Sequence, residues 1–128
     1  MKLLLDTHAF MWWHSEPERI SKDTLILLQN PNHELLVSLA SLWEMQIKIQ
    51  LGKLTLKDDL DIMVRTQQEQ NNISLIYITF AHILELRNLP PHHKDPFDRI
   101  LIAQSKVENA NLISRDPVFQ NYDCSVIW

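Results

Sequence analysis

The chain has 128 residues, of which 45% are hydrophobic and 22% charged, a balance typical of one globular domain. A formal net charge of −4 argues against a nucleic-acid binder that relies on an overall basic charge. The single cysteine, Cys124, excludes an internal disulfide and a thiolate metal cluster, so we expect a buried, inert thiol. No apolar run approaches the ~18 residues of a membrane span, and Asp6 comes too early for a signal peptide. We therefore expect a cytoplasmic protein with no membrane partner.

The first half of the chain alternates short apolar runs with segments of helical periodicity. Buried strands are expected over 2–5 and 35–37, which are short and almost wholly apolar. Either Ser38 or Ser41 is the expected N-cap of a helix that stops near Gly52. Further helices are predicted over 8–14, 21–28 and 60–70, and an extended segment over 54–56.

The second half continues the same alternation. A strand is expected over 74–78, a helix from Thr79 to Arg87, a helix over 95–108, and strands over 112–114 and 125–127. Short apolar strands between helices predict a three-layer α/β/α sandwich around a mostly parallel sheet of four to five strands. In such sheets, ligands bind outside the carboxyl ends of the strands.

Four acidic residues are predicted at that end of the sheet. Asp6 directly follows the first strand, Glu44 lies on the helix that leaves the second strand, and Asp116 follows the fourth. Asp98 stands at the start of an apolar helix, where a carboxylate close to the core needs a partner. Clustered carboxylates repel one another, and a divalent cation such as Mg²⁺ or Mn²⁺ relieves that repulsion. The chemistry that needs such a site is attack of a metal-activated water on a phosphodiester.

The segment 95–104 by itself admits two interpretations. Asp95 as N-cap, Pro96 at the first helical position and Asp98 as the acid of a capping box would explain it by helix capping alone. Alternatively, Asp95 caps the helix while Asp98 binds a metal ion.

The ordered set of motifs resembles PIN-domain proteins, specifically the VapC-like toxins of type II toxin–antitoxin pairs. The matching segments are LLLDTH at 3–8, SLASLWE at 38–44, IK at 47–48, GKL at 52–54, DPFDRILIAQ at 95–104 and LISRDPVF at 112–119. The resemblance covers 1–128 as a single PIN domain. It implies a Mg²⁺-dependent ribonuclease, with Mn²⁺ as the alternative cation.

By residue-wise comparison, the resemblance implies that Asp6, Glu44, Asp98 and Asp116 are both the catalytic residues and the metal ligands. Asp6 and Asp98 are the best ligands, and Asp116 is the most variable of the four. The implied partners are an inhibitory cognate antitoxin, an RNA substrate and a second copy of the chain, with DNA contacted only through the antitoxin. Large aromatic residues fit such interfaces: Phe10, Trp12, Trp13, Trp43, Phe80 and Trp128.

Two other functions remain open: a PIN-domain nuclease of RNA maturation or repair without an antitoxin, and a non-catalytic regulatory binding module.

Residues near the four acids have less specific roles. His92 and His93 are set aside as ligands because adjacent loop residues rarely chelate one ion. Thr7 is expected to orient the carboxylate of the residue before it through its hydroxyl. Arg99 and Arg115 each adjoin a site acid and either pair with it or bind phosphate.

Overall fold

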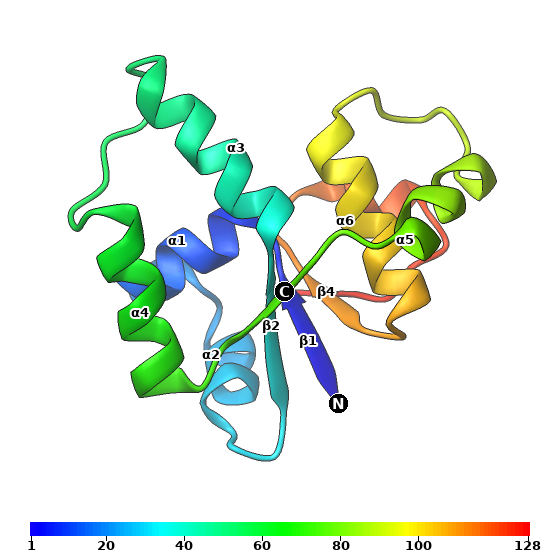
Figure 1. Ribbon diagram of the computed structural model, residues 1–128. Helices are drawn as coiled ribbons and strands as arrows, with labels where there is room; N and C mark the ends of the chain where they lie inside the picture. The colour runs from blue at the N-terminus through cyan, green and yellow to red at the C-terminus, as the bar shows by residue number, and fades with distance from the viewer.

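A five-stranded parallel sheet forms the centre of the computed structural model, which describes residues 1–128 (Figure 1). The strands are β1 Lys2–Leu5, β2 Glu34–Ser38, β3 Ser74–Ile76, β4 Asn111–Ile113 and β5 Val126–Ile127. Their order is β3-β2-β1-β4-β5, and all four pairings are parallel. Every strand therefore ends at the same edge of the sheet, and the expected fold class is confirmed.

Six α-helices surround the sheet: α1 Thr7–Ser15, α2 Lys22–Gln29, α3 Leu39–Gln50, α4 Leu60–Asn71, α5 Phe80–Glu85 and α6 Pro96–Val107. The Ser38 hydroxyl accepts a 3.0 Å hydrogen bond from the Ala40 N–H, so Ser38 rather than Ser41 is the N-cap of α3. Helix α5 ends at Glu85, before the expected Arg87, because the chain tightens into a 3₁₀ turn over Leu86–Asn88. Two more 3₁₀ turns cover Pro17–Arg19 and Pro117–Asn121. No helix is both apolar enough and long enough to cross a lipid bilayer.

The strands bury side chains on both faces of the sheet. Leu3 and Leu5 of β1 pack in a core with residues of α1, α2, α3 and α4, whereas Leu4 packs in a second core dominated by α6. Residues 35 to 37 of β2 divide between the two cores in the same alternating way. In Figure 1, α1, α2 and α4 accordingly lie on one side of the strands, and α5 and α6 on the other. A strand covered on both faces is apolar at every position, which explains the runs in the sequence.

Candidate functional site

Asp6 stands where the central strand ends and α1 begins. Its Oδ1 accepts a 2.8 Å hydrogen bond from the Ala9 N–H, and its Oδ2 accepts a 2.6 Å bond from the Ser114 hydroxyl. The residue is only 6% exposed. Burial raises the pKa of the Asp6 carboxyl and the charge of Asp116 adds to the rise, although the two hydrogen bonds oppose it. Because burial disfavours the charged form of Asp6, a nearby cation would stabilise that form.

Asp116 lies beside Asp6, at the end of the neighbouring strand. Its N–H donates to the Ser114 hydroxyl at 3.0 Å, and its own Oδ1 accepts from the Val118 N–H at 3.0 Å. Ser114 therefore contacts both acids. The two carboxylates open onto a depression of about 220 Å³ that is lined by Asp6, His8, Trp12, Arg115, Asp116 and Pro117.

Glu44 reaches the same region from the second turn of α3, and it is buried. Its Oε1 accepts a 2.7 Å hydrogen bond from the Thr7 hydroxyl, and its Oε2 pairs with Lys48 Nζ at 3.2 Å. The expectation that Thr7 orients Asp6 is therefore wrong. Thr7 is the first residue of α1 and its hydroxyl bonds a residue of α3, whereas the Asp6 carboxylate bonds the N-terminal turn of α1 and Ser114.

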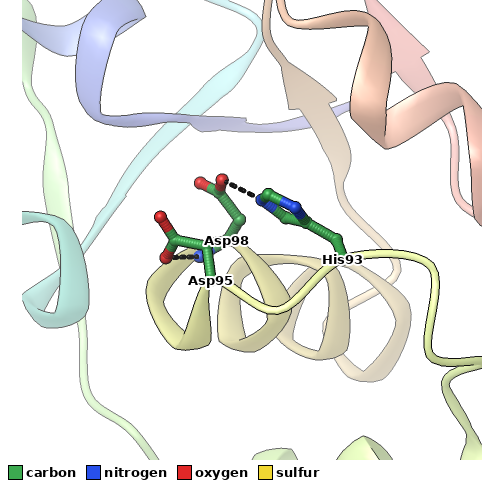
Figure 2. Close-up of side chains that lie close together, drawn as sticks. All are labelled: His93, Asp95 and Asp98. Atoms are coloured by element: carbon green, nitrogen blue, oxygen red, sulfur yellow. Dashed lines mark hydrogen bonds and ion pairs between the residues drawn. The ribbon is translucent and has the colours of Figure 1, made fainter.

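Asp98 belongs to the first turn of α6, directly behind the N-cap. Asp95 Oδ1 accepts from the N–H groups of Phe97 at 2.9 Å and of Asp98 at 3.2 Å, as expected of a helix cap. The Asp98 side chain does not complete a capping box. Its Oδ2 instead accepts a 2.7 Å bond from His93 Nε2 (Figure 2). Figure 2 shows the three side chains of His93, Asp95 and Asp98 gathered at the mouth of the helix.

The Asp98 carboxyl has a strongly perturbed acidity. Burial raises its pKa to about 6, and the charges of Asp95 and Glu44 contribute to the rise, against the hydrogen bond from His93. One ligand atom each from His93, Asp95 and Asp98 lies within 4.8 Å of the others. Helix α3, which carries Glu44, packs against α6, which carries Asp98.

The four acids thus form two electrostatically coupled pairs at one edge of the sheet. Asp116 raises the pKa of Asp6, and Glu44 raises the pKa of Asp98. Thr7 links the pairs, since it follows Asp6 in the chain and bonds Glu44. Carboxylates from four separate segments, two of them with raised pKa values, fit a hard divalent cation with oxygen ligands.

Comparison of the sequence with protein-family models identifies the family of this chain. The model of the PIN domain matches residues 3–123, nearly the whole chain. The chain belongs to the PIN-domain family. No curated protein sequence matches it.

Solved structures with the same fold span the full PIN domain. This chain is similar to a chain in the structure of VapBC2 from Rickettsia felis bound to a promoter DNA fragment, with a TM-score of 0.76 at 16% identity. The match covers 99% of this chain and 98% of that one. A chain of VapBC-1 from nontypeable Haemophilus influenzae gives a TM-score of 0.68 at 18% identity, with 99% and 97% covered. A toxin–antitoxin complex from Klebsiella pneumoniae gives 0.64 at 18%, with 98% and 96% covered. At these identities the likeness establishes the fold.

His93, which the sequence analysis set aside as a ligand, contacts Asp98 in this PIN domain. The two adjacent histidines do diverge, because the His92 ring packs against the Tyr122 ring at 5.5 Å between centroids, while His93 bonds Asp98. Adjacency was therefore a sound reason to reject a His–His chelate. The feature of the sequence that could have indicated this contact is the position of His93, two residues before the N-cap Asp95, in the loop that precedes α6.

The two arginines next to site acids behave differently. The Arg99 guanidinium donates to the backbone carbonyls of Pro90 at 3.0 Å and of His93 at 3.3 Å, so it fixes the loop before α6 and forms no ion pair with a site acid. Arg115 lines the acidic depression and is exposed. Its guanidinium carbon lies 5.7 Å from the Trp12 ring centroid, and it forms no ion pair, so it remains available to a phosphate.

Proposed function

We propose that this PIN domain is a Mg²⁺-dependent endoribonuclease and the toxin of a type II toxin–antitoxin pair, with Mn²⁺ as the alternative cation. The observation that carries the nuclease proposal is the convergence of Asp6, Glu44, Asp98 and Asp116 at the carboxyl edge of the sheet, with raised pKa values at Asp6 and Asp98. The toxin proposal is supported by the fold shared with chains of VapBC complexes.

In this proposal, Asp6 and Asp98 are the principal metal ligands, and Glu44 and Asp116 complete the acidic site. A bound cation supplies charge for the phosphodiester and acidity for the attacking water. The chain's own residues hold the carboxylates in place: the Ser114 hydroxyl fixes Asp6, and the Thr7 hydroxyl fixes Glu44. The free guanidinium of Arg115 is positioned to bind a substrate phosphate beside Asp116.

The antitoxin is proposed to bind a groove along α3 and α4. This groove, of about 930 Å³, is lined by five hydrophobic residues, by polar residues that include Arg65, and by an acidic rim of Asp58, Asp59 and Asp61. A second groove shares residues 54–56 with it and reaches His8 and Trp12, which also line the acidic depression. An amphipathic segment with basic residues fits this path, and an arginine at its end would meet the site carboxylates.

The homodimer is proposed to form through the exposed apolar residues around α5. Tyr77 is 71% exposed, Phe80 72% and Ile83 49%, and Ile78 and Leu84 are also exposed. We call these five residues the α5 surface. Aromatic and aliphatic side chains are enriched at the centre of protein interfaces, and a second copy of the chain would cover them symmetrically.

The deciding experiment is cleavage of single-stranded and stem–loop RNA in Mg²⁺ or Mn²⁺, repeated with excess EDTA and with the protein product of the adjacent small reading frame. Cleavage that requires the cation and is lost with the partner supports the full proposal. Cleavage that the partner leaves unchanged favours a nuclease of RNA maturation or repair. Cleavage undiminished in EDTA overturns the metal mechanism, and no cleavage of any RNA favours the non-catalytic binding module.

A further inference from the structure

The position of His93 is fixed from both sides. Its backbone carbonyl accepts a 3.3 Å hydrogen bond from Arg99 Nη1, which also binds the carbonyl of Pro90. Its ring bonds Asp98 at 2.7 Å, and its side chain is 27% exposed. An imidazole anchored at its backbone and half enclosed beside an acid is preorganised, whereas a free loop histidine would sample many rotamers.

The atoms that face this ring make a mixed nitrogen and oxygen donor set. His93 offers Nε2, Asp98 offers its carboxylate, and Asp95 has an Oδ2 that makes no hydrogen bond while its Oδ1 caps the helix. All three can present a ligand atom within 4.8 Å of the others (Figure 2). Donor atoms that close together can share one ion after small side-chain rotations, because bonds from nitrogen and oxygen to such ions are about 2.0–2.2 Å long.

We propose that His93 is a nitrogen ligand of the metal centre and gives it a preference for first-row transition cations, such as Mn²⁺ and Co²⁺, over Mg²⁺. The inference rests on the proposed function in one respect, namely that Asp98 binds a cation. Mg²⁺ favours oxygen ligands and retains its waters, whereas imidazole suits transition metals. A ring that held the ion through Nε2 would carry its proton on Nδ1 and would give up its present hydrogen bond to Asp98.

The neighbouring groups favour this role over a purely structural hydrogen bond. Two acids face the ring, because a ligand atom of Asp95 and one of Asp98 both lie within 4.8 Å of a ring nitrogen of His93. A single imidazole can offset only part of that negative charge, and a divalent ion offsets more. His92 provides a built-in comparison, since it lies next in the chain but packs on the Tyr122 ring away from the acids.

The test is metal binding, measured without RNA. Pulsed electron paramagnetic resonance of the Mn²⁺ complex detects the ¹⁴N coupling of a bound imidazole, and calorimetry gives the Mn²⁺ and Mg²⁺ affinities. We expect the nitrogen coupling in the unmodified protein and in His92→Gln and His8→Gln. In His93→Gln it should vanish, with a loss of Mn²⁺ affinity of about tenfold or more and a much smaller change for Mg²⁺.

The alternative outcomes separate this inference from the proposed function. Mn²⁺ binding with no nitrogen coupling, or with a coupling that survives in His93→Gln, overturns the role of His93 and leaves the carboxylate site standing. A coupling lost only in His8→Gln assigns the ligand to His8 and also overturns it. If neither cation binds the unmodified protein, both the inference and the metal mechanism fail. Circular dichroism of each variant shows whether a loss of binding reflects a loss of fold.

Discussion

The hydroxyl of Ser114 donates a 2.6 Å hydrogen bond to Asp6 Oδ2, which joins the ends of β4 and β1 at the centre of the acidic site. The same hydroxyl accepts a 3.0 Å hydrogen bond from the N–H of Asp116, so one buried serine contacts both Asp6 and Asp116. This bond opposes the rise in the pKa of Asp6 that burial causes.

We expect Ser114→Ala to lower RNA cleavage by about tenfold or more, as the loss of a group that holds a metal ligand in place does in metal sites. Without this bond the Asp6 carboxylate loses its orientation and its pKa rises further. The cost in free energy of unfolding should be about 1–3 kcal/mol, because a buried acceptor is left unpaired. Ser105→Ala is the matched control, since Ser105 is equally buried and its hydroxyl bonds only the Ile102 carbonyl. Equal cleavage by the two variants, measured beside urea unfolding, would remove Ser114 from the site.

Asp6→Asn and Asp98→Asn should each lower cleavage by at least about two orders of magnitude and weaken binding of Mg²⁺ or Mn²⁺, because each removes a charged ligand. Asp95→Asn should have a much smaller effect, since asparagine caps a helix about as well as aspartate. All three should fold, which circular dichroism can check. If Asp95→Asn inactivates the protein and Asp98→Asn does not, the roles of the two residues are reversed.

The stability of the protein should fall as the pH rises from about 4 to 6. The pKa of Asp98 is about 6 in the folded chain against an ordinary value of 3.8, so in this range the folded state binds more protons than the unfolded state. The carboxyl is partly exposed, and we expect a loss on the order of 1 kcal/mol. Urea unfolding of the metal-free protein and of Asp98→Asn measures it. The stability advantage of the variant should grow across this range and be constant above it, and a pH-independent difference would contradict the assignment.

Phe80→Asp should convert the proposed dimer to a monomer, because it places a charge in the α5 surface. Ile26→Asp is the control, since Ile26 is 65% exposed on α2, outside the α5 surface. Light scattering at micromolar concentration gives the mass of each. A strict monomer before any substitution, or a dimer that persists in Phe80→Asp, would exclude this surface as the interface.

Asp61→Lys should weaken binding of the antitoxin by about tenfold and leave RNA cleavage unchanged. The residue lies on the acidic rim of the groove, in the first turn of α4, and is exposed. Asp23→Lys is matched, because Asp23 is an exposed acid in the first turn of α2, outside the groove. Calorimetric titration with the partner compares the two. Equal affinities would place the antitoxin elsewhere on the chain.

The sequence determined the order of the elements, because burial on both faces makes the strands mostly apolar runs, and five of the six α-helices begin with a side chain that caps them. It also placed Asp6 directly after β1 and Asp116 three residues after the end of β4, and these two parallel strands end together. The sequence also predicted Asp95 as the N-cap of α6, a hydrogen bond to a residue two positions along the chain. These features depend on residues only a few positions apart, and pattern reasoning reaches them.

Only the tertiary structure decided which side chains meet. The bond from Thr7 to Glu44 spans 37 residues, and that from Ser114 to Asp6 spans 108. Nothing in the spacing along the chain distinguishes Thr7 as a partner of Glu44 from Thr7 as a partner of Asp6. The choice depends on the packing of α1 against α3 and of β4 beside β1. The position of His93 could not be predicted for a different reason. Arg99 holds the loop that carries His93 through hydrogen bonds to backbone carbonyls, and these bonds follow no repeating pattern in the sequence.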